Sequence, residues 1–421
     1  MLIEFRVANH RSIRDEQVLT MEAANIGAKD DPIPRSVPGY SKKLLPAAAI
    51  YGANASGKSN VLSAFEYMRR FVLTSMREWD PASGVPRVAF AWSGAANTES
   101  LFEVEFLIDN IRYNYGFAAN DERFLEEWLY AWPNKRRQMW FVRDIDEFKF
   151  GSTLRGDKLP INQFTRPDSL FLSVAAQFNH EQLTPIYRWF GNTSVINLES
   201  ITTRRALPYF GEQLASIKLM QWQDRQLKMD FASNNEESSQ NLDRFRSMIK
   251  SADLGIEDFK FEDIESSLQV ERPLSSNRML RPARKRVMVK HQPGSIEAWL
   301  PLAEESKGTQ AMFRIAPEII SALNSGGLLV VDELEASMHP LLSIMLIMQF
   351  NDPKINKKNA QMIFSTHDTK LLAPSVEGFR FRRDQIWITE KGGDGETKLY
   401  PLTDFRPRNG ENIERGYLMG R

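Results

Sequence analysis

Residues 44–64 read LLPAAAIYGANASGKSNVLSA, and this stretch decides the fold. An apolar run is followed by a glycine-rich turn and then by apolar residues at helical spacing, which predicts a strand, a loop and a helix. The turn, residues 52–59, matches the pattern G-x-x-x-x-G-K-[ST] in full. In such loops the backbone N–H groups surround phosphate oxygens, and the helix N-terminus adds a favourable dipole. The stretch therefore predicts a phosphate-binding loop.

Each residue type in the loop has an expected role. Lys58 is predicted to reach the β- and γ-phosphates of a nucleotide, and the Ser59 hydroxyl is predicted to bind Mg²⁺. Both residues therefore count as nucleotide-binding, and Lys58 also as catalytic. The other expected nucleotide-binding residues of this stretch are Gly52, Asn54, Ala55, Ser56, Gly57 and Asn60.

A second apolar run, GGLLVVDE over residues 326–333, ends in two carboxylates. Charges at the end of a buried strand are costly unless they have partners or a role. Downstream of a phosphate loop, the first acid, Asp332, is predicted to orient the Mg²⁺ shell. The next acid, Glu333, points to the other side of the strand and is predicted to act as the general base on the attacking water.

A third apolar run, IFSTH over residues 363–367, ends in a histidine. It lies one strand-helix-strand unit after Asp332, so its end is expected beside that carboxylate. Sites in such sheets lie at the carboxyl ends of the strands. We therefore expect His367 to lie near the γ-phosphate as a sensor.

The middle of the chain follows a different pattern. From about residue 86 to 165, stretches such as VPRVAFAW (85–92) and SLFEVEFLI (100–108) alternate apolar and polar residues, which predicts an antiparallel β-lobe. We predict an α/β protein with a mixed sheet core, an antiparallel β-lobe and a helical insertion. The expected parts are an N-terminal half with the phosphate loop over 1–165, the helical insertion over 166–255 and a C-terminal half over 256–421.

Composition excludes several classes of protein. Lys plus Arg number 54 and Asp plus Glu number 54, so the formal net charge is zero and binding of nucleic acid by bulk charge is excluded. Without cysteine there is no disulfide framework. The first residues lack the apolar core of a signal peptide, and the longest apolar stretch is about half as long as a membrane span. We expect a cytoplasmic protein that has no membrane partner.

The three sites together resemble the ABC-type ATPase heads of the RecF/SMC group, most closely the OLD-like and abortive-infection branch. Within this branch the chain is similar to the ATPase subunit of PARIS-type systems. The resemblance covers roughly residues 1–65 and 300–421. Residues 332–340, DELEASMHP, are similar to its Walker B motif and D-loop, and His367 to its switch histidine. The family's N-x-R-S element is matched by residues 9–12, which implies that Arg11 lies near the nucleotide phosphates.

The resemblance also implies how the chain assembles. Residues 305–310, ESKGTQ, resemble the S-x-G-T form of the ABC signature motif. Ser306 and the Gly308 backbone would then donate to the γ-phosphate of a nucleotide held by a second copy, at a helix N-terminus. This implies ATP and Mg²⁺ as cofactors, ATP hydrolysis, and a head-to-head dimer or a higher assembly of dimers. Gln177 is a candidate for the Q-loop glutamine.

The biological role implied by the resemblance is a nucleotide-gated sensor or scaffold in anti-phage defence. Only 54 residues follow His367, too few for a nuclease domain, so the effector, a nuclease or toxin, is expected on another chain. A RecF-like repair ATPase that binds DNA in an ATP-dependent way stays open as an alternative. The basic residues between Arg278 and Lys290 would serve such binding, or else form a solvated strand face beside acids.

Two further alternatives fit the sequence less well. The nucleotide-binding subunit of a membrane transporter predicts a shorter chain with a clear Q-loop, and the β-lobe argues against it. A P-loop kinase of small metabolites would need neither a signature motif nor a switch histidine.

Overall fold

The structure is a computed structural model of the 421-residue chain. It divides into two compact units, which are described separately: Met1–Ile196, Ala322–Glu335 and Ser343–Arg421 form the first, and Asn197–Ser321 with Ala336–Leu342 form the second. Part of the predicted helical insertion lies outside the described residues, which are 1–28, 30–81, 83–92, 94, 97–197, 236–252, 255–263, 285–291, 298–336, 338–372 and 379–405.

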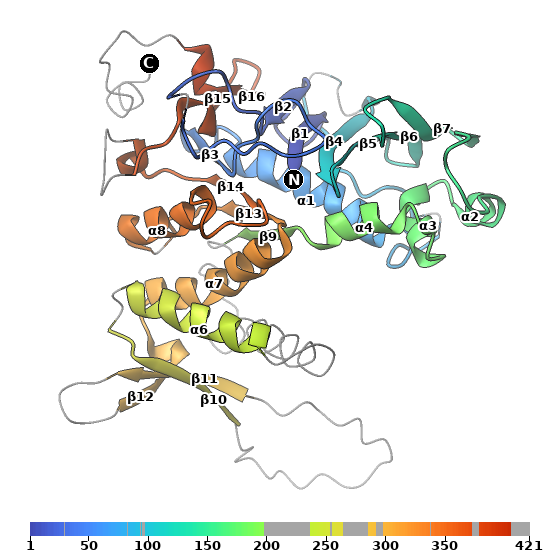
Figure 1. The fold of residues 1–421 in the computed structure, drawn as a ribbon. Helices are drawn as coiled ribbons and strands as arrows, with labels where there is room; N and C mark the ends of the chain where they lie inside the picture. Colours follow the sequence, from blue (N-terminus) through green and yellow to red (C-terminus); the bar gives the residue numbers. More distant parts are fainter. Residues whose placement is uncertain are drawn as a thin grey trace, which may run out of the picture. The chain divides into compact units, whose positions relative to one another are not determined.

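A seven-stranded antiparallel sheet carries the predicted β-lobe (Figure 1). Its strand order is β2-β1-β4-β5-β6-β7-β8, and each neighbouring pair is antiparallel. The two N-terminal strands thus complete a sheet built mainly by residues 100–150. The strands are β1 (Leu2–Ala8), β2 (Gln17–Thr20), β4 (Ser100–Ile108), β5 (Ile111–Ala119), β6 (Phe124–Trp132), β7 (Gln138–Asp144) and β8 (Glu147–Phe150).

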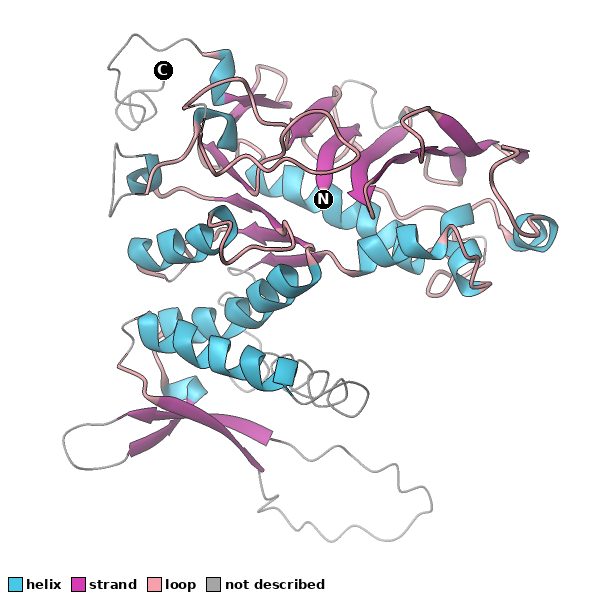
Figure 2. Cartoon of the chain, in the orientation of Figure 1, coloured by secondary structure: helices cyan, strands magenta, loops and turns pink. Residues whose placement is uncertain are grey.

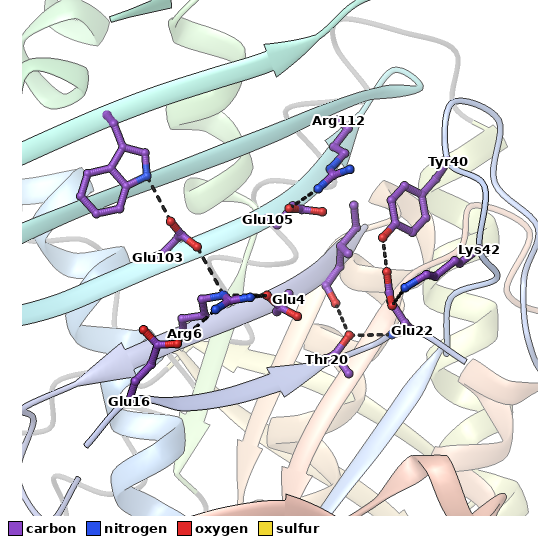
Figure 3. Close-up of polar contacts among 12 residues, drawn as sticks. Glu4, Arg6, Glu16, Thr20, Glu22, Tyr40, Lys42, Glu103, Glu105 and Arg112 are labelled. Carbon is purple, nitrogen blue, oxygen red and sulfur yellow. Dashed lines mark hydrogen bonds and ion pairs between the residues drawn. The ribbon is translucent and has the colours of Figure 1, made fainter. Parts of the chain in front are cut away.

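One face of this sheet carries a row of ion pairs (Figure 3). The Arg6 guanidinium lies 2.6 Å from Glu4, 3.1 Å from Glu16 and 3.4 Å from Glu103. Arg112 pairs with Glu105 at 2.7 Å. These pairs join opposite charges within a strand and between neighbouring strands, which is typical of the partly solvated side of an antiparallel sheet.

A six-stranded mixed sheet holds the phosphate loop. Its order is β16-β15-β3-β14-β13-β9. The four strands β15, β3, β14 and β13 are parallel to one another, and β16 is antiparallel to β15. The central strands are fully buried, as their unbroken apolar runs predict. The strands are β3 (Ala47–Gly52), β9 (Ser194–Asn197), β13 (Leu328–Asp332), β14 (Gln361–Ser365), β15 (Ile386–Lys391) and β16 (Thr397–Pro401).

The helix α1 (Lys58–Thr74) joins the cores of both sheets. Its buried residue Phe65 belongs to one apolar cluster with Phe102 of the seven-stranded sheet and Val330 of the six-stranded sheet. The short helices α3 (Phe171–Gln177) and α4 (Thr184–Gly191) contribute to the same cluster, as does Ile161 of α2 (Leu159–Phe164). The core therefore fixes the start of α1 relative to the strand ends.

The second unit contains the helix α6 (Glu236–Ser251) and a three-stranded antiparallel sheet in the order β10-β11-β12. The rings of Phe245, Phe259 and Phe313 meet edge to face, with centroids 4.8–5.6 Å apart. They attach α6 and the sheet to α7. The remaining elements are β10 (Asp258–Asp263), β11 (Lys285–His291), β12 (Ala298–Pro301), the 3₁₀ turn η3 (Leu302–Glu304), and the helices α7 (Lys307–Ser325) and α8 (Pro340–Asn351), which belong to both units by residue range.

The predicted fold class is confirmed: the chain has a mixed parallel sheet, an antiparallel β-lobe and helices (Figure 2). The strand predicted over residues 85–92 is wrong, because no strand is formed there. Phe90 of that segment is buried, but its backbone N–H donates to the Asn9 side chain instead of a strand. Among the described residues, no helix combines the length and apolarity that crossing a bilayer requires.

Candidate functional site

The phosphate loop lies between β3 and α1, as the sequence predicts. Gly57 precedes α1 with a φ of 108°, and a Cβ there would lie 2.0 Å from the Thr397 Oγ1 atom of β16, so only glycine fits. No side chain caps the helix N-terminus at Gly57. The backbone N–H groups of the first turn are therefore oriented for an anion such as a phosphate.

The Lys58 side chain folds back over the loop. Its ammonium donates to the carbonyl oxygens of Gly52 at 2.9 Å and Ala53 at 3.2 Å. Burial lowers the pKa of Lys58, while the carboxylates of Glu335, Glu333 and Asp332 oppose this shift. The ammonium thus lies between the loop and the acidic strand end, where a bound phosphate would contact it.

Asp332 is the centre of a small oxygen cluster. Its Oδ1 atom accepts hydrogen bonds from the Ser59 hydroxyl at 3.1 Å and from the Ser365 hydroxyl at 2.6 Å. Hydroxyl and carboxylate oxygens are the ligands that Mg²⁺ prefers, and Mg²⁺ takes its remaining ligands from water and phosphates. The described residues contain no group of three or more acidic or histidine side chains that could hold a metal ion. Ser59 and Asp332 therefore suit an ion that is shared with a nucleotide.

Glu333 follows the end of β13 in a left-handed conformation, with a φ of 56°. Its backbone N–H donates to the Ser365 hydroxyl at 2.7 Å. Such a φ costs a non-glycine residue about 1–2 kcal/mol, so the surrounding contacts must hold it in place. Ser365 thus orients the backbone of Glu333 as well as the carboxylate of Asp332.

His367 lies just after β14, which pairs in parallel with both β13 and β3. The ends of all three strands therefore meet at one edge of the sheet. The His367 backbone N–H donates to the Glu335 carboxylate. Partial burial and the Lys58 ammonium lower the pKa of His367, and Glu335 and Asp332 oppose the shift. Its imidazole thus shares the electrostatic environment of the phosphate loop.

Residues behind the loop hold it against β15 and β16. The Asn60 side chain donates to the Ser12 hydroxyl at 2.6 Å, and Ser12 contacts the Thr397 hydroxyl at 2.6 Å. The Ser56 hydroxyl contacts that of Thr389 at 2.6 Å. Ser56 is buried, whereas Ala53 to Ala55 form the exposed rim of the loop. In this structure Ser56 and Asn60 support the loop through their side chains.

Arg11 is exposed, and its guanidinium lies 5.7 Å from the centre of the Tyr67 ring on α1. Its backbone has a φ of 53°. The predicted contact between Arg11 and the nucleotide phosphates stays a prediction. Gln177, the Q-loop candidate, is the exposed last residue of α3.

The signature-like residues belong to the second unit and lie at the start of α7. The Ser306 hydroxyl accepts the backbone N–H of Thr309 at 3.1 Å, which makes Ser306 the N-cap of a 19-residue helix. Ser306 is exposed, and Gly308 lies in the first turn. The Gln310 side chain donates to the carbonyls of Ala303 and Glu305 and thereby fixes the preceding turn.

The basic stretch that the sequence offered for DNA lies largely outside the described residues, since 264–284 are not among them. Within the described part, Arg286 of β11 pairs with Glu262 of β10 at 2.7 Å. This is the pairing of a solvated strand face with its neighbouring acids.

Sequence reasoning assigned no role to Ser365 or Glu335, which contact Asp332 and His367. Both lie in the quoted motifs: Ser365 is two residues before His367, and Glu335 is two residues after Glu333. Their position beside the acidic strand end was the available signal.

Comparison with known proteins agrees with this fold. An SMC head bound to the C-winged helix domain of ScpA has a similar structure, with a TM-score of 0.51, 13% identity and 99% coverage of each chain. An SMC head domain from Thermotoga maritima is less similar, with a TM-score of 0.41, 13% identity, and coverage of 95% of this chain and 98% of that one. No curated protein matches the chain by sequence.

One family model matches the sequence over residues 47–153 and 142–373, which together span the phosphate loop, the acidic strand end and His367. This is more than half of the chain. The fold is that of an ABC-type ATPase head of the RecF/SMC type. The chain belongs to the family described as "AAA domain, putative AbiEii toxin, Type IV TA system".

Proposed function

We propose that this chain binds ATP with Mg²⁺ and hydrolyses it at composite sites, each completed by two copies of the chain. The observation that carries the proposal is the oxygen cluster of Ser59, Asp332 and Ser365 directly beside the phosphate loop. A Mg²⁺ ion held there with the nucleotide would neutralise charge on the β- and γ-phosphates. This cluster joins the start of α1 to the ends of β13 and β14. It therefore brings the phosphate loop and the acidic side chains together, as phosphoryl transfer requires.

The side chains around the cluster then have distinct roles. Lys58 exchanges its carbonyl partners for phosphate oxygens and holds the nucleotide by charge. Glu333 accepts a proton from the attacking water as general base. His367 senses the γ-phosphate from the end of β14. Asp332 and Ser59 hold the metal ion, and the backbone of the loop binds the phosphates.

The second half of each site comes from the signature loop of another copy. Ser306 caps α7 and is exposed, so the N-terminus of this helix is open to an anion from outside the chain. ATP held by one copy would therefore attract the α7 N-terminus of the other. Nucleotide binding would close the pair and hydrolysis would reopen it, a two-state change driven by the nucleotide.

Glu333→Gln provides the direct test, since it removes the base but keeps the size of the side chain. We expect this variant to bind ATP, to hydrolyse it at a rate reduced at least 100-fold, and to accumulate dimers in light scattering only with ATP. Lys58→Ala is the control and should lose both binding and dimerisation. An E333Q variant that hydrolyses ATP normally would contradict the role of Glu333, and one that binds ATP but stays monomeric would contradict the composite site.

We further propose that the ATPase acts in anti-phage defence as a nucleotide-gated sensor or scaffold, similar to the ATPase of PARIS-type systems. The description of the family, which names a toxin and a toxin–antitoxin system, supports this role. The effector would be a nuclease or toxin on a separate chain.

The defence role can be tested in cells that carry the gene together with its chromosomal neighbours. We expect phage plating to fall with the wild type and to recover with Lys58→Ala or with deletion of the neighbouring effector gene. Equal plating on all strains would contradict the defence role. ATP-dependent DNA binding with a steep salt dependence would instead support the RecF-like repair alternative.

A further inference from the structure

The two sides of β3 differ, and this gives a bound nucleotide a direction. β14 and β13, which lead to His367 and Asp332, lie on one side of β3, and β15 and β16 lie on the other. Ser59 contacts Asp332 on the first side, whereas the next residue, Asn60, contacts Ser12 beside β16. If the γ-phosphate faces Asp332, as proposed above, the opposite side of the loop, toward β15 and β16, is left for the α-phosphate and the base.

An exposed tryptophan lies on this second side. The Trp92 side chain is 56% exposed, and its ring rests against Gly395 in the turn between β15 and β16. A Cβ on Gly395 would lie 2.6 Å from the Trp92 ring, so the close contact depends on glycine. Gly395 is two positions before Thr397, whose hydroxyl bonds to the carbonyl of Ser56 in the phosphate loop at 3.0 Å. The indole therefore contacts the β15–β16 hairpin, which also bonds to the phosphate loop.

The backbone that carries Trp92 is fixed although the indole is exposed. The Arg11 backbone N–H donates to the Val88 carbonyl at 2.8 Å, and the Phe90 N–H donates to the Asn9 side chain at 2.8 Å. The buried Phe90 ring meets the Trp92 ring edge to face at 5.4 Å. This indole is thus held in place by its neighbours while much of its surface stays free, which is how a stacking platform is built.

We propose that Trp92 is the platform on which the base of the bound nucleotide stacks. The inference rests on the proposed ATP site, because only a nucleotide held by Lys58 and Ser59 has its base on this side. The ligand class is a purine nucleoside phosphate, since the larger π-face of a purine gains more from stacking on an indole. Trp92 would thus add affinity for the base to the affinity of the loop for phosphates.

The test compares ATP, ADP and inorganic tripolyphosphate by isothermal titration calorimetry. We expect Trp92→Ala to weaken ATP and ADP binding about tenfold and Trp92→Phe to weaken it less than threefold, because a smaller aromatic ring keeps part of the stacking. Tripolyphosphate, which has no base, should bind all three proteins equally. Phe164→Ala is the matched control, since Phe164 is also an aromatic residue that is 57% exposed, but on α2; its ATP affinity should equal that of the wild type.

Three outcomes would overturn the inference, and they have different meanings. If W92A binds ATP like the wild type while Lys58→Ala does not, the stacking role is wrong and the phosphate site stands. If the W92A substitution weakens the binding of tripolyphosphate as much as the binding of ATP, Trp92 acts on the phosphate loop and not on the base. If the wild type binds neither ATP nor tripolyphosphate, the proposed function itself is wrong. A melting temperature equal to that of the wild type shows that W92A is folded.

Discussion

The Ser365 hydroxyl lies 2.6 Å from the Asp332 Oδ1 atom and donates a hydrogen bond to it. The same hydroxyl accepts the backbone N–H of Glu333 at 2.7 Å. One small side chain at the end of β14 thus orients the proposed metal ligand and the residue proposed as general base, both at the end of β13. The arrangement exists because β13 and β14 are parallel neighbours.

Removing this hydroxyl should impair catalysis without unfolding the protein. Ser365→Ala frees the Asp332 carboxylate and the Glu333 backbone, and the loss of such an outer ligand contact costs about 10–100-fold in metal affinity or activity. We expect ATPase activity to fall by this factor and the Mg²⁺ concentration for half-maximal activity to rise.

The matched control is Ser343→Ala. Ser343 is equally buried, but its hydroxyl has no hydrogen-bond partner within the described part of the chain. We expect this variant to keep the wild-type rate. Equal activity in S365A and the wild type would contradict the role of Ser365.

Glu335 is expected to act as a positioning residue through the His367 backbone. Its carboxylate accepts the His367 N–H, so Glu335→Ala should release the loop after β14. The loss of one such hydrogen bond predicts a kcat about five- to tenfold lower, with little change in KM for ATP. Glu335→Gln keeps an oxygen acceptor and should restore most of the rate. Steady-state kinetics would contradict this account if both variants were equally impaired, because charge would then matter more than the hydrogen bond.

The β-lobe should depend on a buried acid that the sequence did not single out. Glu127 is fully buried, accepts the Tyr115 hydroxyl at 2.9 Å, and accepts the backbone N–H groups of Phe171 and Leu172 at the start of α3. Burial raises the pKa of Glu127, while the nearby Arg143 guanidinium opposes the shift.

Glu127→Ala leaves these three donors without their acceptor and removes a carboxylate from the neighbourhood of the Arg143 charge, so it should lower the free energy of unfolding by about 3–5 kcal/mol. Its neighbour Glu126 is exposed, so Glu126→Ala should change stability by less than about 0.5 kcal/mol. Urea unfolding of the two variants checks this expectation. Similar midpoints would show that the buried network contributes little.

Stability should also depend on pH through His10. This side chain is buried between the rings of Tyr67 and Phe102, and burial, aided by Arg11, lowers its pKa to about 3. Since the unfolded pKa is 6.5, unfolding binds a proton over this range, and the stability due to neutral His10 is lost as pH falls below 6.5.

Between pH 6.5 and pH 4.5 the wild type should lose about 2 kcal/mol more of its free energy of unfolding than His10→Gln, at up to about 1.4 kcal/mol per pH unit. Denaturant titrations of both proteins at several pH values measure the difference in slope. If the free energies of unfolding of the two proteins changed equally with pH, a group other than His10 would be responsible for the pH dependence.

The elements around the phosphate loop could be predicted because their sequence is decisive locally. A buried apolar run before Gly52, the glycine turn and helical spacing after Lys58 require little knowledge of the rest of the chain. The same holds for the apolar runs that end at Asp332 and Ser365. Their meeting at one sheet edge follows from the parallel order of the strands.

The parts that the sequence could not give depend on contacts across the fold. The alternation in residues 85–92 predicts that Phe90 and Trp92 share one face of a strand. In the structure Phe90 is buried, Trp92 is exposed, and the Asn9 side chain takes the place of a strand partner. The hydrogen bond from Ser365 to Asp332 joins residues 33 positions apart, and it depends on the register of two strands. Spacing along the chain cannot fix such a register.

The most direct test of the account mixes two inactive variants, Lys58→Ala and Ser306→Arg. If each site takes Lys58 from one copy and Ser306 from the other, a mixed pair has one intact site. Half of randomly formed pairs are mixed, so an equal mixture should recover about a quarter of the wild-type ATPase rate per chain.

Lys58→Ala mixed with Glu333→Gln is the control and should stay inactive, because both residues serve the same half-site and every site is then defective. The account predicts that the first mixture recovers activity and the second does not. A first mixture with no more activity than the sum of its two variants would contradict a nucleotide site shared between two copies.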